Sequence, residues 1–237
     1  MIDDYIVQSL EVLNKIQCEL DEYSKTKTSL IYPQKNEPKK GGPLKRISEQ
    51  EGKILLCHIL LQKNVVFSLE TPTVEKYSFT GNRNISGNLD LCIYEIRNNK
   101  YYRTNCIEYK AHNMRKTYKT DFQKLLHEQG NNYFIHILQS ADNYTLCSLK
   151  EKKSKGKPVI NKYLNDINDI LKTTTDLNFN TITLYICVLS PFLIIKKKIH
   201  NSELTLSMNE NDFFLDYCIK ENNIIINNQN WELVKNT

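Results

Sequence analysis

The sequence predicts an α/β protein with a central mixed β-sheet flanked by helices. Segments whose apolar side chains recur at helical spacing alternate with shorter apolar runs that are typical of strands. Between residues 47 and 140 the expected order is helix, strand, strand, strand, helix, strand, a pattern that favours a mixed sheet covered by helices. A chain of 237 residues with 40% hydrophobic residues is large enough to bury a substantial core.

The first expected helix covers residues 2–23, where apolar side chains form a helical stripe. A basic stretch with Pro and Gly follows at 33–46 and predicts a linker. Ser48-Glu49-Gln50-Glu51 then opens a second helix, which we expect from Glu49 to Gln62.

The strands of the sheet are expected where short apolar or alternating runs occur. Thr71-Pro72-Thr73 should end the first of them, because these residues break a strand. Thr120-Asp121 should cap a helix that ends near Glu128, and another helix should cover Val159–Leu171. The expected strands are 65–69, 89–96, 102–111, 133–138, 181–190 and 192–199.

The expected organisation is one domain with an N-terminal appendage. Residues 1–32 form an N-terminal helix and 33–46 the basic linker. The central unit is 47–140, and 141–237 is a C-terminal extension of the same domain, with strands and a helix.

Composition limits the classes of protein to consider. A net charge of +5 permits a polyanionic partner without requiring one. The seven cysteines are an odd number without the spacing of a metal knuckle, so we interpret them as reduced thiols of a cytoplasmic protein. No apolar run approaches the roughly 18–20 residues needed to span a bilayer, so no membrane association is expected.

Two neighbouring strands carry the residues that point to a chemistry. Asp90 lies in the strand 89–96, whereas Glu108 and Lys110 are two residues apart in the strand 102–111 and therefore share a face. If these strands form a hairpin, Asp90 falls opposite Glu108 to within a residue or two. Two carboxylates and an ammonium group then converge, as in a divalent-metal site that hydrolyses a phosphodiester.

The alternation of apolar residues places Asp90 and Glu108 on matching faces of the two strands. Cys92 and Cys106 on that face indicate that it is not simply exposed to solvent. Because buried like charges seldom persist without a cation, Mg²⁺ is the expected cofactor, with Mn²⁺ as a substitute. The alternative is that Glu108 and Lys110 are surface charges of an edge strand. The opposite face of the first strand should carry Leu89, Leu91 and Ile93.

Asp90 followed by Glu108-Tyr109-Lys110, on a hairpin between two helices, resembles the PD-(D/E)XK nuclease superfamily, which has the restriction-endonuclease-like fold. The resemblance covers residues 46–140, and Asn88-Leu89 precedes Asp90 where the named motif has proline. It implies Asp90, Glu108 and the backbone carbonyl of Tyr109 as metal ligands, with Lys110 as the catalytic lysine.

The implied activity is a Mg²⁺-dependent endonuclease that hydrolyses DNA phosphodiester bonds, with RNA as an alternative substrate. Members of this size are often restriction or anti-phage defence nucleases that act as homodimers or higher homo-oligomers. Two other classes stay open. One is a catalytically inactive relative that serves as a nucleic-acid-binding or assembly subunit, and the other is a scaffold domain whose charged hairpin is coincidental.

The resemblance also suggests a helical glutamate, and Glu51 is the candidate because it shares a helical face with apolar residues that point at the sheet. The alternative is a capping box in which Ser48 and Glu51 stabilise the helix start. Glu49 is expected to face solvent.

Basic residues after the second strand are candidate phosphate contacts, although such residues more often form a solvated helix face. His136 lies among apolar neighbours and is interpreted as a core histidine. The candidate nucleic-acid contacts are Arg115, Lys116, Lys119 and Lys124.

Overall fold

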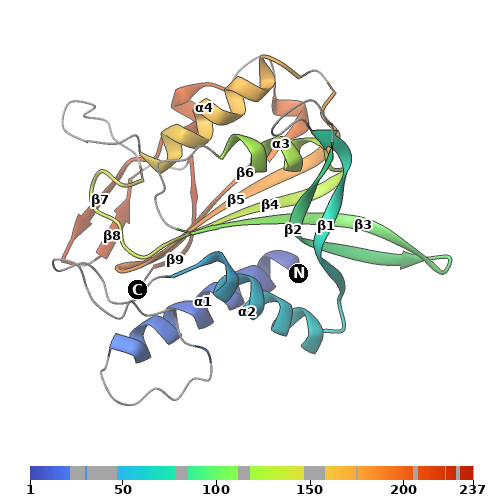
Figure 1. The fold of residues 1–237 in the computed structure, drawn as a ribbon. Helices are drawn as coiled ribbons and strands as arrows, with labels where there is room; N and C mark the ends of the chain where they lie inside the picture. Colours follow the sequence, from blue (N-terminus) through green and yellow to red (C-terminus); the bar gives the residue numbers. More distant parts are fainter. Residues whose placement is uncertain are drawn as a thin grey trace.

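A computed structural model of the chain describes residues 1–21, 30, 47–77, 85–111, 118–146, 158–174, 176–204, 208–221, 223–227 and 230–236. The linker expected at 33–46 lies outside the described residues. The elements below keep their chain order (Figure 1).

The helices agree closely with the sequence pattern, because α2 and α4 begin and end where the apolar stripes do. They are α1 (Ile2–Asp21), α2 (Glu49–Gln62), α3 (Lys119–His127), α4 (Val159–Leu171) and α5 (Glu210–Phe213), with a 3₁₀ helix η2 (Asn201–Glu203). The strands are β1 (Val66–Tyr77), β2 (Ile85–Arg97), β3 (Lys100–Ala111), β4 (Gly130–Leu138), β5 (Phe179–Leu189), β6 (Phe192–His200), β7 (Tyr217–Lys220), β8 (Asn223–Ile226) and β9 (Glu232–Asn236).

Within the described residues, seven strands form one mixed sheet in the order β1-β2-β3-β4-β5-β6-β9. Strands β3, β4 and β5 are parallel, and the other neighbouring pairs are antiparallel. The predicted class, a mixed sheet flanked by helices, is therefore confirmed. Strands β5, β6 and β9 come from the expected C-terminal extension and continue the same sheet.

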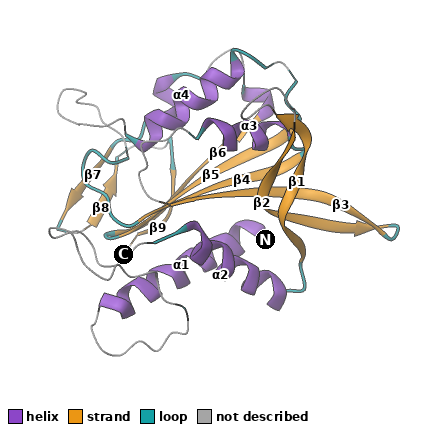
Figure 2. Ribbon diagram, in the orientation of Figure 1, coloured by secondary structure: helices purple, strands orange, loops and turns teal. Residues whose placement is uncertain are grey.

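Helices cover both faces of this sheet (Figure 2). Helices α1 and α2 lie on one face, and α3 and α4 lie on the other. Each face has its own hydrophobic core, which we call the α2-side core and the α3-side core. The α2-side core includes Leu56, Leu60, Leu91, Ile107 and Tyr109, and the α3-side core includes Leu89, Cys106, Phe122, Leu125 and Phe134.

Helix α2 approaches the sheet closely at Gly52. A Cβ atom at this position would lie 2.6 Å from Cδ1 of Ile137 and 3.2 Å from the ring of Tyr109. Glycine at this position therefore lets the first turns of α2 lie directly against the ends of β3 and β4.

Strands β2 and β3 form a hairpin whose outer end extends beyond both helical layers (Figure 1). Its two-residue turn, Asn98-Asn99, has φ angles of 49° and 58°. Positive φ at both central residues is typical of a type I′ turn, whose twist matches that of the paired strands. We call the segment 94–103 the hairpin arm.

Two local expectations are wrong. Thr71-Pro72-Thr73 does not end β1, which continues to Tyr77 with a shift of register after Pro72. Proline is tolerated because β1 is an edge strand, so the backbone N–H that Pro72 lacks is not required for pairing on the solvent side. Helix α3 begins at Lys119, after Tyr118, which forms no side-chain cap, so Thr120 and Asp121 lie inside the helix and do not cap it.

The interpretation of His136 as a core histidine is confirmed, because its side chain is fully buried and its Nδ1 lies 2.5 Å from the hydroxyl of Tyr163. The five cysteines whose side chains are described are free thiols. Among the described helices, none is both long and apolar enough to cross a membrane.

Candidate active site

The predicted hairpin of β2 and β3, with Asp90 opposite Glu108 to within a residue or two, is confirmed by the register of the two strands. The antiparallel ladder pairs Leu91 with Ile107, which makes Asp90 and Glu108 the next residues along the two strands. Beyond the Leu91–Ile107 pair, no further backbone pair of the β2–β3 ladder follows within the described residues. Instead, the backbone N–H of Tyr109 donates a hydrogen bond to Asp90 Oδ2 at 2.7 Å. The carboxylate of Asp90 is therefore held at the edge of β3.

The two carboxylates do not lie on matching faces of the sheet, which corrects the sequence-based expectation. Leu91 belongs to the α2-side core, whereas Leu89 belongs to the α3-side core, so the alternation of β2 slips at Asp90. Glu108 and Lys110 follow Cys106 on the α3 side of β3. The site thus lies where β2 and β3 separate, within reach of helices from both faces.

Asp90 forms an ion pair with a buried lysine of α2. The ammonium group of Lys53 lies 3.0 Å from Asp90 Oδ1 and 2.7 Å from Glu70 Oε1. The side chain of Lys53 is only 6% exposed, whereas that of Glu70 on β1 is 59% exposed. The flanking pairs Leu69–Leu91 and Thr71–Leu89 place Glu70 beside Asp90.

Glu108 forms an ion pair with a second buried lysine, which belongs to α3. Nζ of Lys124 lies 2.5 Å from Glu108 Oε1 and 2.8 Å from the carbonyl oxygen of Asn88. Burial raises the pKa of the Glu108 carboxyl well above its ordinary value, Lys124 opposes this, and the nearby carboxylates of Asp121 and Asp90 add to it. Glu108 is therefore a carboxylate that needs nearby positive charge to stay ionised.

Lys110 lies between the first turns of α2 and α3. Its Nζ is 3.3 Å from Asp121 Oδ2 and 3.8 Å from Glu49 Oε1. Burial lowers the pKa of Lys110, but the carboxylates of Asp121, Glu49 and Glu108 outweigh it and raise the pKa above its ordinary value. Lys110 is therefore a protonated ammonium group at neutral pH.

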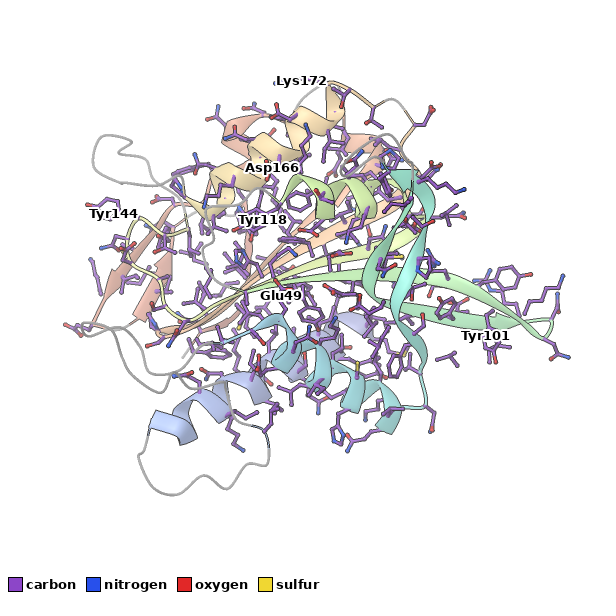
Figure 3. All side chains as sticks on the ribbon, in the orientation of Figure 1. Glu49, Tyr101, Tyr118, Tyr144, Asp166 and Lys172 are labelled. Carbon is purple, nitrogen blue, oxygen red and sulfur yellow. The ribbon has the colours of Figure 1, made fainter. Side chains whose placement is uncertain are left out.

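The helical glutamate at this site is Glu49, not Glu51. The carboxylate of Glu51 accepts hydrogen bonds from the backbone N–H and the hydroxyl of Ser48, at 2.8 and 2.5 Å. This is the capping box that the sequence allowed as an alternative. Glu49 precedes it by two residues and lies between α2 and the sheet (Figure 3). Its carboxylate reaches Lys110 instead. Burial raises the pKa of Glu49, and Asp90 and Asp121 add to this against the pull of Lys110.

Two of the four predicted nucleic-acid contacts, Lys119 and Lys124, lie within the described residues. Arg115 and Lys116 lie outside the described residues. Lys119 is half-buried at the start of α3. The ammonium group of Lys124 is buried against Glu108, so in this arrangement it does not face a phosphate.

The residues that hold Mg²⁺ in the sequence-based hypothesis fit such an ion in part. Among the described residues, no group of three His, Cys, Asp and Glu side chains is arranged to hold a metal. Mg²⁺ commonly uses only one or two protein carboxylates, completed by waters and substrate. Because a strand residue directs its N–H and C=O toward the same neighbour, the carbonyl of Tyr109 also faces β2, where Asp90 lies.

The ionisable side chains around Asp90 and Glu108 carry a net negative charge when all are ionised. We call the side chains linked by these ion pairs, together with Asp90 and Glu108, the carboxylate–lysine cluster. Among the described residues it contains five carboxylates and three ammonium groups, which leaves two net negative charges when all are ionised. A divalent cation would neutralise that excess. The members are Glu49, Lys53, Glu70, Asp90, Glu108, Lys110, Asp121 and Lys124.

Four members of this cluster were not selected from the sequence. Glu49 and Lys53 are four residues apart and so share a face of α2, a spacing that was a usable signal. Asp121 was considered only as a helix cap. Glu70 gave no signal, because its position beside Asp90 depends on the pairing of β1 with β2.

No family model, curated protein or solved structure matches this chain.

Proposed function

We propose that this chain is a metal-dependent nuclease with a restriction-endonuclease-like core, and that it hydrolyses phosphodiester bonds of DNA. The observation that carries the proposal is the partly buried carboxylate–lysine cluster, with its excess of two negative charges, around Asp90, Glu108 and Lys110. The surplus lies in Glu49 and Glu70, which are 34% and 59% exposed, whereas the three more buried carboxylates are matched by the three lysines. A cluster of ionisable groups with shifted pKa values favours a functional site.

In the proposed site, Asp90, Glu108 and the carbonyl of Tyr109 would hold Mg²⁺ or Mn²⁺. When bound, the ion supplies Lewis-acid polarisation of the scissile phosphate and a more acidic water. Asp90 is already fixed for this role by the N–H of Tyr109. Glu108 would exchange part of its contact with Lys124 for the ion.

Lys110 and Glu49 take separate roles in this proposal. Because Lys110 stays protonated, it acts as a hydrogen-bond donor that offsets charge growing on the phosphate, and it does not act as a base. Glu49 has a raised pKa and is about one-third exposed, so it is suited to accept a proton from the attacking water. Asp121 holds Lys110 from the opposite side and fixes its position.

The biological setting follows from the resemblance alone. We propose a restriction or anti-phage defence nuclease that acts in the cytoplasm as a homodimer or higher homo-oligomer. DNA is the proposed substrate and RNA the alternative.

A second candidate is a nucleic-acid-binding or assembly subunit without catalysis. The observation in its favour is that Lys53 and Lys124 already contact both proposed metal ligands. In such a protein the lysines would be permanent counter-ions, and no divalent cation would be needed.

Plasmid cleavage with Mg²⁺ or Mn²⁺ tests the proposal. We expect the wild type to cleave, and Asp90→Ala and Lys110→Ala to lose cleavage by about 100-fold or more, because each removes a group that acts in the transition state. Asp169→Ala and Lys172→Ala provide a matched control, since these residues form an exposed ion pair at 3.1 Å on α4.

Cleavage that survives both site substitutions would reject the site. Metal-independent DNA binding without cleavage would favour the second candidate.

A further inference from the structure

We infer that Lys53 is a built-in competitor for the metal at Asp90, and that Glu70 is the alternative acceptor to which Lys53 transfers when the metal binds. This inference rests on the proposed function, because it concerns the same cation site. It identifies two positioning residues that set the affinity of the site for a divalent cation.

The first observation is the position of the Lys53 ammonium group. It contacts Asp90 Oδ1 at 3.0 Å, while Asp90 Oδ2 is occupied by the N–H of Tyr109. A cation that binds Asp90 through Oδ1 therefore competes with Lys53 for that oxygen. Since the side chain of Lys53 is only 6% exposed, it would be a costly unpaired charge if it simply lost its partner.

The second observation is Glu70, which provides that partner. Its Oε1 is 2.7 Å from Nζ of Lys53, so Lys53 can release Asp90 and stay paired with a carboxylate. Glu70 lies on the edge strand β1 and is exposed to solvent, whereas Asp90 is largely enclosed. Its carboxylate can therefore follow Lys53 without disturbing the core.

The third observation is the backbone of Glu70. Its φ of 48° is in the left-handed region, although its neighbours Leu69 and Thr71 remain paired with β2. A residue other than glycine rarely adopts this conformation without an interaction that stabilises it. The contact with Lys53 is such an interaction, and the unusual backbone aims the Glu70 side chain at it.

These contacts define an exchange between two cations at one carboxylate. Without metal, Lys53 bridges Glu70 and Asp90. With metal, Lys53 is retained by Glu70 alone, and Asp90 Oδ1 turns to the ion. The affinity of the site is then lowered by Lys53 and partly restored by Glu70.

Calorimetric titration of the purified full chain with Mn²⁺ tests this exchange. We expect Lys53→Met to bind Mn²⁺ about tenfold more tightly, because the ion no longer competes with Lys53 for Asp90. A tenfold change corresponds to the free energy of about one hydrogen bond to a charged group. We expect Glu70→Gln to bind about tenfold more weakly, because Lys53 then has Asp90 as its only carboxylate partner in this pair. Matched controls are Lys63→Met at the end of α2 and Glu75→Gln on β1, both exposed, which should change the affinity less than twofold.

The double variant Lys53→Met/Glu70→Gln separates exchange from plain electrostatics. If Glu70 acts through Lys53, the effect of Glu70→Gln should nearly vanish in the Lys53→Met background. If Glu70→Gln weakens Mn²⁺ binding equally in both backgrounds, its charge acts directly on the ion, and the exchange is refuted. Glu70 is a surface residue, so Glu70→Gln should fold normally. If Lys53→Met folds poorly, Lys53→Gln can replace it in the same comparison.

The outcomes also separate this inference from the proposed function. Wild type that binds Mn²⁺ at Asp90, with affinity unchanged by either single substitution, overturns the exchange and leaves the nuclease proposal standing. Absence of Mn²⁺ binding in both the wild type and Lys53→Met overturns both.

Discussion

Glu49 and Glu51 lie two residues apart in the first turn of α2, yet their carboxylates have unrelated partners. Glu51 closes the capping box with Ser48, and Glu49 extends to Lys110. A sequence pattern that places a glutamate at the start of a helix does not distinguish these roles, because either residue satisfies it.

Alanine substitutions of the two glutamates should therefore affect different properties, stability for Glu51 and cleavage for Glu49. We expect Glu51→Ala to lower the free energy of unfolding by about 1 kcal/mol through loss of the cap, with cleavage largely retained. We expect Glu49→Ala to lower kcat by about 100-fold with little change in stability, because it removes a proton acceptor at the site. Urea denaturation and cleavage kinetics measured on both variants check this. Loss of cleavage in Glu51→Ala alone would reverse the assignment.

At this scale the two-residue period of a strand was sufficient to place Glu108 and Lys110 on the same side of β3, where both lie near α3. It was insufficient for the slip of alternation at Asp90. That slip arises where the ladder between β2 and β3 is replaced by a side-chain contact to Tyr109, and no local pattern encodes such a contact.

Among the elements, the hairpin arm is the one that we expect to contact DNA if the proposed function is correct. It belongs to the same strands that carry Asp90 and Glu108, and it extends beyond the helices that cover the sheet (Figure 1). Tyr101 is 68% exposed, and the side chain of Arg97 is 63% exposed and lies over the ring of Tyr102 at 5.8 Å. A two-stranded ribbon fits the major groove of DNA, and cations at its end contact phosphates.

Removing the arm's charges should weaken binding of a long DNA duplex and make it less dependent on salt. For Arg97→Gln/Lys100→Gln we expect the slope of log K against log salt to become shallower by about 1 to 2, because each lost phosphate contact removes about 0.9. Fluorescence anisotropy over a range of salt concentrations measures this slope. Lys63→Gln/Lys172→Gln, which also removes two exposed charges, should leave it unchanged. An equal slope for both double variants would remove the arm from the proposed interface.

Element boundaries were mostly predictable, and the exceptions have a common cause. Helices α2 and α4 follow directly from their apolar stripes. Strand β1 continues past Pro72 because it is an edge strand, and whether a strand is at the edge depends on the order of the whole sheet. Helix α3 starts at Lys119, ahead of Thr120 and Asp121, so these residues lie in its first turn, where Asp121 pairs with lysines of β3 and of its own helix.

At the scale of the whole molecule, the sheet with helices on both faces brings the first turns of α2 and α3 to the end of β3. The fold class and the order of the first elements were predictable, since the alternation of helical and strand patterns determines them. The position of β5, β6 and β9 beyond β4 was not, because the pairing of distant strands leaves no local signal.

The net negative charge of the carboxylate–lysine cluster has a consequence for overall stability. A ligand that binds only the folded state stabilises it, by about 2.7 kcal/mol at 100 times its Kd. For a chain of this size we expect such a concentration of Mg²⁺ to raise the Tm by about 5 °C or more. Scanning calorimetry with Mg²⁺, with EDTA, and with KCl of matched ionic strength checks this. The increase should be lost in Asp90→Asn, and an equal increase with KCl would attribute it to screening.

The most direct test of the central claim is a crystal structure of the protein with Mn²⁺, with the metal located by its anomalous scattering. We expect a peak within about 2.0–2.4 Å of carboxylate oxygens of Asp90 and Glu108, next to the carbonyl of Tyr109, with Lys53 displaced from Asp90. A map without a peak there, in which Lys53 and Lys124 still occupy the two carboxylates, would contradict the account.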